Sequence, residues 1–285
     1  MWYDRVMTNA PKPLEVRKSS KPQKSTSWEH VAEWYDRLLE GNGAGTYQKE
    51  LILPNLLRLM DLKPGDRVLD LACGQGFFTR EFFKITKNVT GADASKALVA
   101  LAKEHSPAAT QGKEGGIDWH VAEADKLPFL KDGSLDKAVI VLALQNMEDL
   151  AGVFKECARV IKPGGSLFFV LNHPAFRIPR ASGWGWDEKE KSQYRRVDRY
   201  LSELKISIDM HPGQKSGGGQ TLSFHRPLQS YFKALGKAGF GVVGMEEWNS
   251  HKKSEPGPRA VAEDKARKEI PLFLCFVCKK IGGNV

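Results

Sequence analysis

Residues 68–76 read Val-Leu-Asp-Leu-Ala-Cys-Gly-Gln-Gly, and this stretch decides the fold of the chain. An apolar strand runs into the carboxylate of Asp70. Gly74 and Gly76 follow at a spacing that lets bare backbone turn tightly and approach a ligand. Phenylalanines at positions 77, 78, 82 and 83 then provide apolar positions at helical spacing. The stretch therefore predicts a strand, a glycine turn and a helix, with a ligand at the turn.

Four further apolar runs follow the first strand, with helical patterns between them, and cover residues 88–92, 117–122, 135–144 and 166–171. This alternation predicts an α/β fold with a parallel sheet and right-handed crossovers. The first three strands lead to Asp70, Asp93 and Asp125. In such a sheet the ligand sits at the carboxyl ends of the strands, so we expect these carboxylates to lie around it.

The order of these segments resembles the class I S-adenosylmethionine-dependent methyltransferases, whose first motif is similar to Asp-x-x-Cys-Gly-x-Gly. The resemblance covers roughly residues 28–280. It implies a doubly wound, mostly parallel, Rossmann-like sheet of seven strands, in which residues 240–248 and 270–279 form an antiparallel final hairpin. It also implies S-adenosyl-L-methionine as the cofactor and methyl donor.

The resemblance implies a role for each matching residue. Asp70 and the loop backbone would hold the methionine part of the donor, Asp93 the ribose hydroxyls, and Asp125 the adenine amino group. The full set expected to bind the donor is Tyr47, Asp70, Ala72, Cys73, Gly74, Gly76, Asp93, Ala94, Ala124, Asp125, Leu127 and Gln145. Gln145 and Asn146, just past the fourth strand, would line the path to the acceptor.

A dinucleotide-binding fold is the main alternative interpretation of the glycine turn. That fold places a third glycine at position 79 for close helix packing, and this chain has Thr79. The carboxylate of Asp70 suits the ammonium and sulfonium of the methyl donor and would repel a phosphate. A purely structural interpretation, in which the three carboxylates only cap strand ends, explains one of them more easily than all three.

Composition favours one domain of the water-soluble type. The chain has 285 residues, which suits a single α/β core with an insertion. No run of about 18 apolar residues occurs, and the first residues contain no apolar signal segment, so we expect a cytoplasmic protein without a membrane partner. Four cysteines without a second Cys-x-x-Cys pair predict reduced, buried thiols and no metal site.

The formal net charge of +9 raises the possibility of an RNA partner. Residues 1–27 contain six basic and two acidic side chains with few apolar ones, which predicts a disordered basic tail ahead of a methyltransferase domain at 28–285. Helical periodicity at the start of that domain predicts lid helices within 28–60. Tyr35 and Tyr47 are candidates to face the acceptor and the donor from this lid, and Trp28 is a weaker one.

Residues 172–226 are too long for a plain crossover and predict a β-rich cap that selects the acceptor. Alternation at 200–208 predicts a strand that pairs antiparallel with 221–225. The residues expected to bind the acceptor are Tyr35, Asn146, Trp186, Tyr194, Tyr200 and Arg226. His173 and His225 stand at the predicted pocket edges with a pKa range suited to a catalytic base, although each also fits a structural role.

Three functions follow from the sequence. The leading one is methyl transfer to a small-molecule acceptor by in-line displacement, in which the protein mainly positions the reactants. The alternative in the same chemistry is a tRNA or rRNA methyltransferase that uses the basic tail. A non-catalytic S-adenosylmethionine-binding protein is disfavoured because Asp70, Asp93 and Asp125 are all present. The sequence leaves open the acceptor, the atom methylated and the oligomeric state.

Overall fold

The computed structural model describes residues 28–33, 36–37, 46–106, 116–209 and 220–281. The predicted basic tail, Tyr35 and the glycine-rich stretches at 41–45 and 217–219 lie outside the described residues. None of the described helices is long and apolar enough to cross a bilayer.

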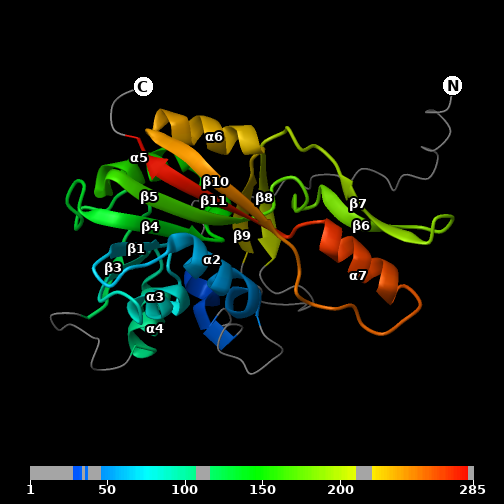
Figure 1. Ribbon diagram of the computed structural model, residues 1–285, viewed down its shortest axis with the longest axis horizontal. Coiled ribbons are helices and arrows are strands. Elements are labelled where there is room, and N and C mark those ends of the chain that lie inside the picture. Colours follow the sequence, from blue (N-terminus) through cyan, green and yellow to red (C-terminus); the bar gives the residue numbers. More distant parts are fainter. Residues whose placement is uncertain (1–27, 34–35, 38–45, 107–115, 210–219, 282–285) are drawn as a thin grey trace.

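A seven-stranded sheet organises the molecule, in the order β10-β11-β5-β4-β1-β2-β3 (Figure 1). Strands β1 to β5 run parallel, whereas β11 is antiparallel to both β5 and β10. This arrangement confirms the predicted doubly wound sheet with an antiparallel final hairpin. The strands are β1 (Arg67–Leu71), β2 (Asn88–Asp93), β3 (Asp118–Val121), β4 (Leu135–Val141), β5 (Ile161–Asn172), β10 (Phe240–Trp248) and β11 (Phe273–Lys280).

Helices cover both faces of this sheet and form two separate cores. The 3-10 helix η4 (Leu144–Asn146), α5 (Leu150–Val160) and α6 (Leu228–Lys237) cover one face (Figure 1). The π-helix η2 (Gln48–Ile52), α2 (Leu53–Met60), α3 (Phe77–Phe83) and α4 (Lys96–Glu104) cover the other. Cys275 belongs to one core and Cys278 to the other, as expected for residues three apart on a strand. All four cysteines are free and buried, as the sequence predicted.

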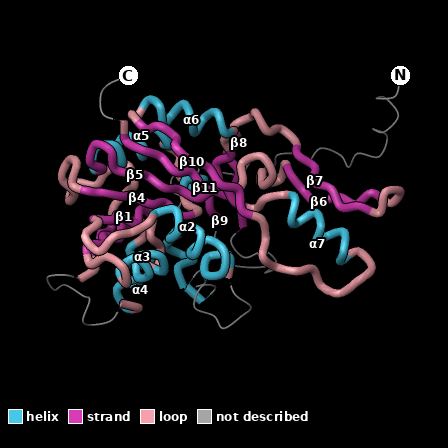
Figure 2. Tube along the Cα trace, in the orientation of Figure 1, coloured by secondary structure: helices cyan, strands magenta, loops and turns pink. Residues whose placement is uncertain are grey.

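The insertion after β5 forms two hairpins rather than one cap. Strands β8 (Leu204–Asp209) and β9 (Gln220–His225) pair antiparallel, as predicted for 200–208 and 221–225, and cross the carboxyl edge of the sheet. Strands β6 (Ser182–Asp187) and β7 (Ser192–Val197) form a second hairpin that packs against α7 (Ala260–Glu269). Figure 2 shows this second hairpin and α7 extending beyond β8–β9 as an arm. Only part of the predicted cap therefore covers the sheet edge.

Candidate functional site

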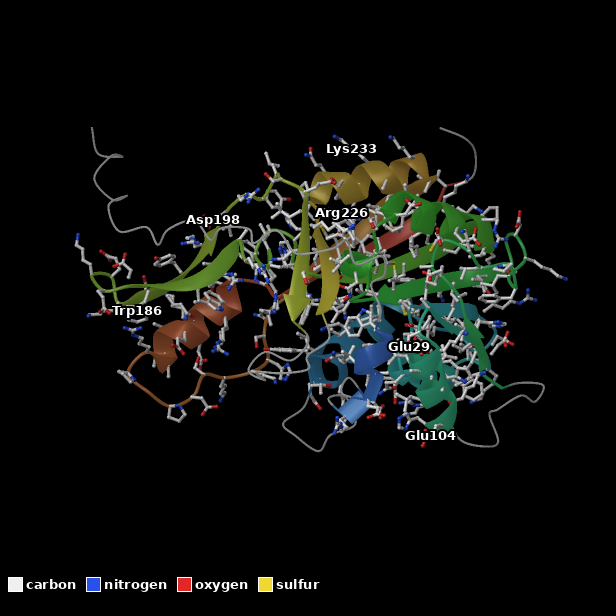
Figure 3. All side chains as sticks on the ribbon, turned by 180° about the vertical axis from the view of Figure 1, so that it is seen from behind. Glu29, Glu104, Trp186, Asp198, Arg226 and Lys233 are labelled. Carbon is white, nitrogen blue, oxygen red and sulfur yellow. The ribbon has the colours of Figure 1, made fainter. Side chains whose placement is uncertain are left out.

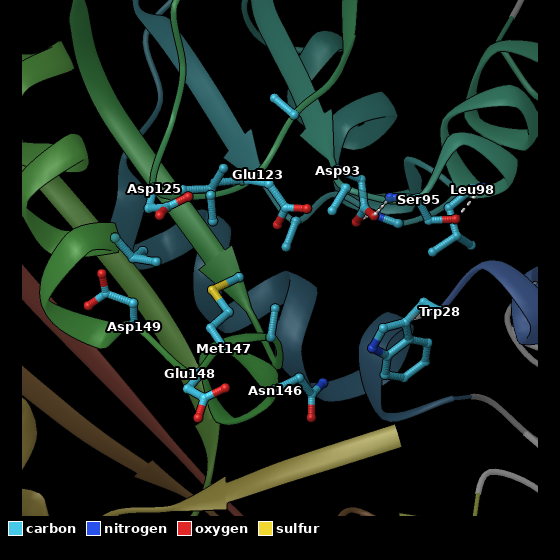
Figure 4. Close-up of a pocket in the computed structure, with 18 of the residues that line it drawn as sticks. Trp28, Asp93, Ser95, Leu98, Glu123, Asp125, Asn146, Met147, Glu148 and Asp149 are labelled. Carbon is cyan, nitrogen blue, oxygen red and sulfur yellow. Dashed lines mark hydrogen bonds between the residues drawn. The ribbon is translucent and has the colours of Figure 1, made fainter. Parts of the chain in front are cut away.

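A cavity of about 730 Å³ lies at the carboxyl edge of the sheet, a size typical of small-ligand pockets. Its walls come from the ends of β1 to β4, from the 3-10 helix η1 (Glu29–Val31) with the preceding Trp28, and from β8–β9 (Figure 4). The predicted residues that line it are Ala72, Gly74, Asp93, Ala94, Ala124, Asp125 and Asn146. The strand-end carboxylates Asp93 and Asp125 therefore meet in one cavity.

The glycine turn holds Asp93 in a fixed position. Ala72 and Gly74 both adopt left-handed backbone angles, with φ of 60° and 56°. The Gly74 N–H donates to Asp93 Oδ2 at 2.9 Å, and the Ser95 N–H donates to Oδ1 at 2.9 Å. Each carboxylate oxygen keeps a further lone pair, so this geometry suits an acceptor for ligand hydroxyls. Burial raises the pKa of Asp93, and these two backbone donors oppose that effect by favouring the charged form.

Asp70 lies beneath the turn and does not line the cavity. Its side chain is buried and accepts a hydrogen bond from the Thr79 hydroxyl at 2.5 Å. Burial is the main reason that the pKa of Asp70 rises to about 7. Thr79, which stands where a dinucleotide fold has glycine, thus joins the start of α3 to the end of β1. Asp70 therefore supports the turn from below and is not part of the cavity lining.

Two glycines near the turn are needed for packing. A Cβ on Gly76 would lie 2.4 Å from the Trp119 ring, and one on Gly91 would also lie 2.4 Å from that ring. Gly76 also has a φ of 81°. Gly76 therefore makes room for Trp119, whereas Gly74 makes the turn at the cavity wall.

Four other residues expected at the donor do not line the cavity. Leu127 is fully buried, and its N–H donates to Glu156 Oε1 at 2.7 Å. Cys73 is buried, and the Gln145 amide donates to the Leu142 carbonyl. The Tyr47 hydroxyl lies 3.0 Å from Ser250 Oγ. These side chains support the walls or lie elsewhere on the sheet edge.

The lining contains acidic residues that sequence reasoning did not single out. Glu29 accepts from the Ser95 hydroxyl at 2.7 Å and joins η1 to the start of α4, while Trp28 faces the cavity (Figure 4). In total the lining has two lysines, Lys126 and Lys205, against six acids: Glu29, Asp93, Glu123, Asp125, Glu148 and Asp149. Such a wall suits a cationic ligand, and the donor implied by the resemblance carries a sulfonium and an ammonium.

The β8–β9 hairpin forms the roof and is tied to the opposite wall. Lys205 and Leu222 line the cavity from this hairpin, and Lys205 Nζ lies 2.9 Å from Glu148 Oε1. Arg226 is buried and donates to the carbonyls of Met147 at 2.9 Å and Glu148 at 2.7 Å. Arg226 was expected to bind the acceptor, but it acts behind the wall by holding the 147–148 backbone.

The two candidate catalytic histidines lie outside the cavity. The Ala175 N–H donates to Nδ1 of His173, so its Nε2–H is the donor to Glu247 Oε1 at 2.7 Å. His225 Nε2 donates to the Tyr200 carbonyl at 2.8 Å. Burial lowers the pKa of both rings and favours the neutral form. The His173 ring thus holds Glu247, and the His225 ring holds the backbone at Tyr200. Neither ring lies where a catalytic base would face the cavity.

The remaining acceptor candidates on the insertion also lie away from the cavity. Trp186 and Tyr194 belong to the β6–β7 hairpin, and Figure 3 shows Trp186 far from Glu29 and Arg226. The Tyr200 hydroxyl accepts from the Leu228 N–H at 3.1 Å and so caps the start of α6. The alternation at 200–208 predicted the strand β8, but no pattern in the sequence indicated that β6 and β7 form a separate hairpin away from the cavity.

Comparison with known proteins connects this geometry to an activity. A family model described as a methyltransferase domain matches residues 69–169. The ubiquinone biosynthesis O-methyltransferase of Nitrosococcus oceani is 31% identical over 169 residues, which is 59% of this chain and 67% of that protein. The ubiquinone/menaquinone biosynthesis C-methyltransferase of Ectopseudomonas mendocina is 31% identical over 157 residues, 54% of this chain and 59% of that protein.

A solved structure extends the similarity beyond the matched domain. The S-adenosylmethionine-dependent methyltransferase from Mesorhizobium loti superposes with a TM-score of 0.65 at 27% identity, covering 82% of this chain and all of that one (100%). The similarity in fold thus extends over much more of the chain than the family model matches.

Proposed function

Since the chain belongs to the class I S-adenosylmethionine-dependent methyltransferases, we propose that it methylates a small-molecule acceptor held beneath the β8–β9 hairpin. The observation that carries this choice of acceptor is the charge of the cavity. Six carboxylates against two lysines line a space of about 730 Å³. This wall attracts a cationic donor and repels the phosphates of RNA.

The donor, when bound, supplies a methyl group on a positively charged sulfur. The residues that would hold it are Asp93 at the ribose hydroxyls, the backbone of Ala72 and Gly74 at the methionine part, and Asp125 at the adenine amino group. All four line the cavity. The Gly74 and Ser95 N–H groups fix Asp93 before the donor arrives, which reduces the entropy lost on binding.

The acceptor would enter between Asn146, Trp28 and the roof residue Leu222, which line the same cavity. The roof would shield this space from water, and a single cavity would hold donor and acceptor side by side. Both effects lower the barrier of an in-line displacement, and a hydroxyl acceptor would in addition lose its proton to water or to one of the carboxylates that line the cavity. The relatives are named for steps of ubiquinone and menaquinone biosynthesis, which favours a ring-shaped organic acceptor over a polynucleotide.

A transfer assay tests this proposal. Purified protein with tritium-labelled S-adenosylmethionine is offered a panel of catechols and hydroquinones in one arm and total transfer RNA in the other. We expect label in the small-molecule arm only. Label in the RNA arm alone would replace the proposal with the RNA methyltransferase alternative. Calorimetry with S-adenosylhomocysteine independently reports whether the donor cavity is intact.

A further inference from the structure

A second group of polar side chains gathers at the same sheet edge, outside the donor cavity. Arg177 lies in the loop after β5, Arg195 on β7 and Lys252 in the loop after β10. Arg195 reaches back to this first loop, since its Nε–H donates to the Phe176 carbonyl at 2.7 Å and its Nη2 to Ser182 Oγ at 3.0 Å. We call Arg177, Arg195, Lys252 and the neighbouring Tyr47 the arginine cluster.

Tyr47 joins the members of this cluster. Lys252 Nζ lies 4.9 Å from the centroid of the Tyr47 ring, and the Tyr47 hydroxyl is within electrostatic reach of Arg177. The ring of His251 also packs on Tyr47, with centroids 5.2 Å apart. Lys252 and Arg177 therefore lie near one half-buried tyrosine, and Arg195 joins them from β7 through its bond to the Phe176 carbonyl beside Arg177.

The charges of the cluster are not neutralised by acids in the part of the chain that the structure describes. No described carboxylate pairs with Arg177, Arg195 or Lys252, and the nearby Glu247 is engaged with His173. Desolvation lowers the pKa of both arginines, and the charge of Arg177 lowers that of Arg195 further. Arg177 is exposed and Arg195 is half-buried, and because their charges repel one another, an anion bound between them would stabilise both guanidinium groups.

The sheet fixes where this cluster lies relative to the donor. The Tyr47 ring packs on Phe273, the first residue of β11, with centroids 5.5 Å apart. Phe273 pairs with Asn172 at the carboxyl end of β5. The donor cavity occupies the ends of β4, β1, β2 and β3, and β11 lies two positions from β4 in the sheet. At about 4.8 Å per strand, roughly 10 Å separates the axes of β4 and β11, which sets the scale of the span from the cavity to the cluster.

We propose that Arg177 and Arg195, supported by Tyr47 and Lys252, bind an anionic group of the methyl acceptor, a carboxylate or a phosphate. The inference rests on the proposed function, because it assumes an acceptor that spans from the donor cavity to the cluster. An aromatic ring that carries its acidic group on a side chain of two or three carbons has about the required length. The acidic cavity repels that group and the cluster attracts it, so the acceptor would enter with its reactive end toward the donor.

Binding measurements with matched probe pairs test this inference. Protein saturated with S-adenosylhomocysteine is titrated by calorimetry with 3,4-dihydroxybenzoate and catechol, and separately with phenyl phosphate and phenol. We expect the acidic member of at least one pair to bind about tenfold more tightly or better. The pair that shows the preference identifies a carboxylate or a phosphate as the group recognised.

Two variants locate the effect. Arg177→Gln removes a guanidinium that has no side-chain partner among the described residues, and we expect it to abolish the preference for the acidic probe. Arg196→Gln is the matched control, because Arg196 is one residue from Arg195 on the opposite face of β7 and pairs with Asp198 at 2.8 Å. This control should keep the preference. Arg195→Gln is informative only if its melting temperature stays near that of the wild type.

Several results would overturn the inference. An absence of preference in the wild type, a preference that survives Arg177→Gln, or an equal loss in Arg196→Gln would each do so. Binding of a single-stranded RNA that depends on Arg177, without any preference among the small probes, would assign the cluster to a polyanion instead. Failure to bind S-adenosylhomocysteine would contradict the proposed function itself, and that result is distinct from the others.

Discussion

The donor cavity and the arginine cluster share one sheet edge but differ in charge and origin. Ends of β1 to β4 and one turn provide most of the cavity, and its lining is acidic. The cluster is basic, and its members come from the segment before α2, the loop after β5, β7 and the loop after β10. We conclude that the strand ends of the sheet form the cavity proposed for the donor, whereas segments outside those strands form the region proposed for the acceptor.

The largest effect that can test the donor side is a pH dependence of stability. The pKa of Asp70 is raised to about 7 in the folded state, against an ordinary value of 3.8. The folded state therefore holds this proton more tightly than the unfolded state, so stability falls as pH rises from about 4 to about 7, by up to about 4 kcal/mol. Urea unfolding at a series of pH values measures this.

Asp70→Asn is the matching variant, because it retains an oxygen acceptor for Thr79 and removes the titration. We expect its stability to vary less over the same pH range. A pH profile unchanged from that of the wild type would show that the titration of Asp70 is not what makes stability depend on pH.

The next effect concerns the donor itself. Asp93→Ala should weaken S-adenosylmethionine binding by about 1.5–3 kcal/mol, because hydroxyl hydrogen bonds to a charged acceptor are lost and the Gly74 N–H loses its partner. Calorimetry measures this, with Asp118→Ala as an exposed control carboxylate. Binding of 3,4-dihydroxybenzoate at the cluster should not change. If both ligands weaken equally, the two regions act as one site.

An effect of intermediate size is expected for variants of the β8–β9 roof and of its contacts. Arg226→Met removes the donors to the Met147 and Glu148 carbonyls and should destabilise the protein by about 1–3 kcal/mol. We expect a higher KM for the acceptor and a smaller change for the donor. Lys205→Met, which removes the exposed ion pair to Glu148, should cost at most about 1 kcal/mol. Equal effects of both variants on donor affinity would argue against a roof that serves the acceptor.

The smallest expected effect is a gain in stability. Ala72 adopts a φ of 60°, which costs a residue with a Cβ about 1–2 kcal/mol relative to the right-handed region. Ala72→Gly should therefore raise the free energy of unfolding by about 1 kcal/mol and leave donor affinity nearly unchanged. Differential scanning calorimetry measures the shift. A loss of stability would indicate that the Ala72 methyl group contributes packing that outweighs the strain.

The sequence predicted which strand ends meet at the cavity, because the signals for this part of the fold are local. Apolar runs, the glycine turn and strand-end acids lie within a few residues of each other, and parallel strands bring their ends together. The pairing of β8 with β9 followed from simple alternation. The resemblance placed Asp70 in the lining, but burial beneath the turn is decided by how Thr79 reaches it from α3.

The acceptor side could not be predicted because its contacts join distant segments. His173 meets Glu247 across 74 residues of sequence, and Tyr47 meets Ser250 across 203. The periodicity of a sequence gives no information about contacts between segments so far apart. We expected Trp186 and Tyr194 to bind the acceptor because of their residue types and the length of the insertion. The β6–β7 hairpin that contains them instead packs on α7 as an arm. Glu29 gave no sequence signal of its contact with Ser95.

The indole of Trp119 has a consequence for how this family member can change. One ring occupies the space that a side chain at Gly76 or at Gly91 would need. Neither glycine can accept a larger residue alone, while a smaller residue at position 119 would leave two vacant sites at once. The three positions are therefore epistatic: double substitutions that shrink Trp119 and enlarge one glycine should be less harmful than the sum of their single changes. The size of the residue at position 119 therefore limits which substitutions are tolerated at Gly76 and Gly91.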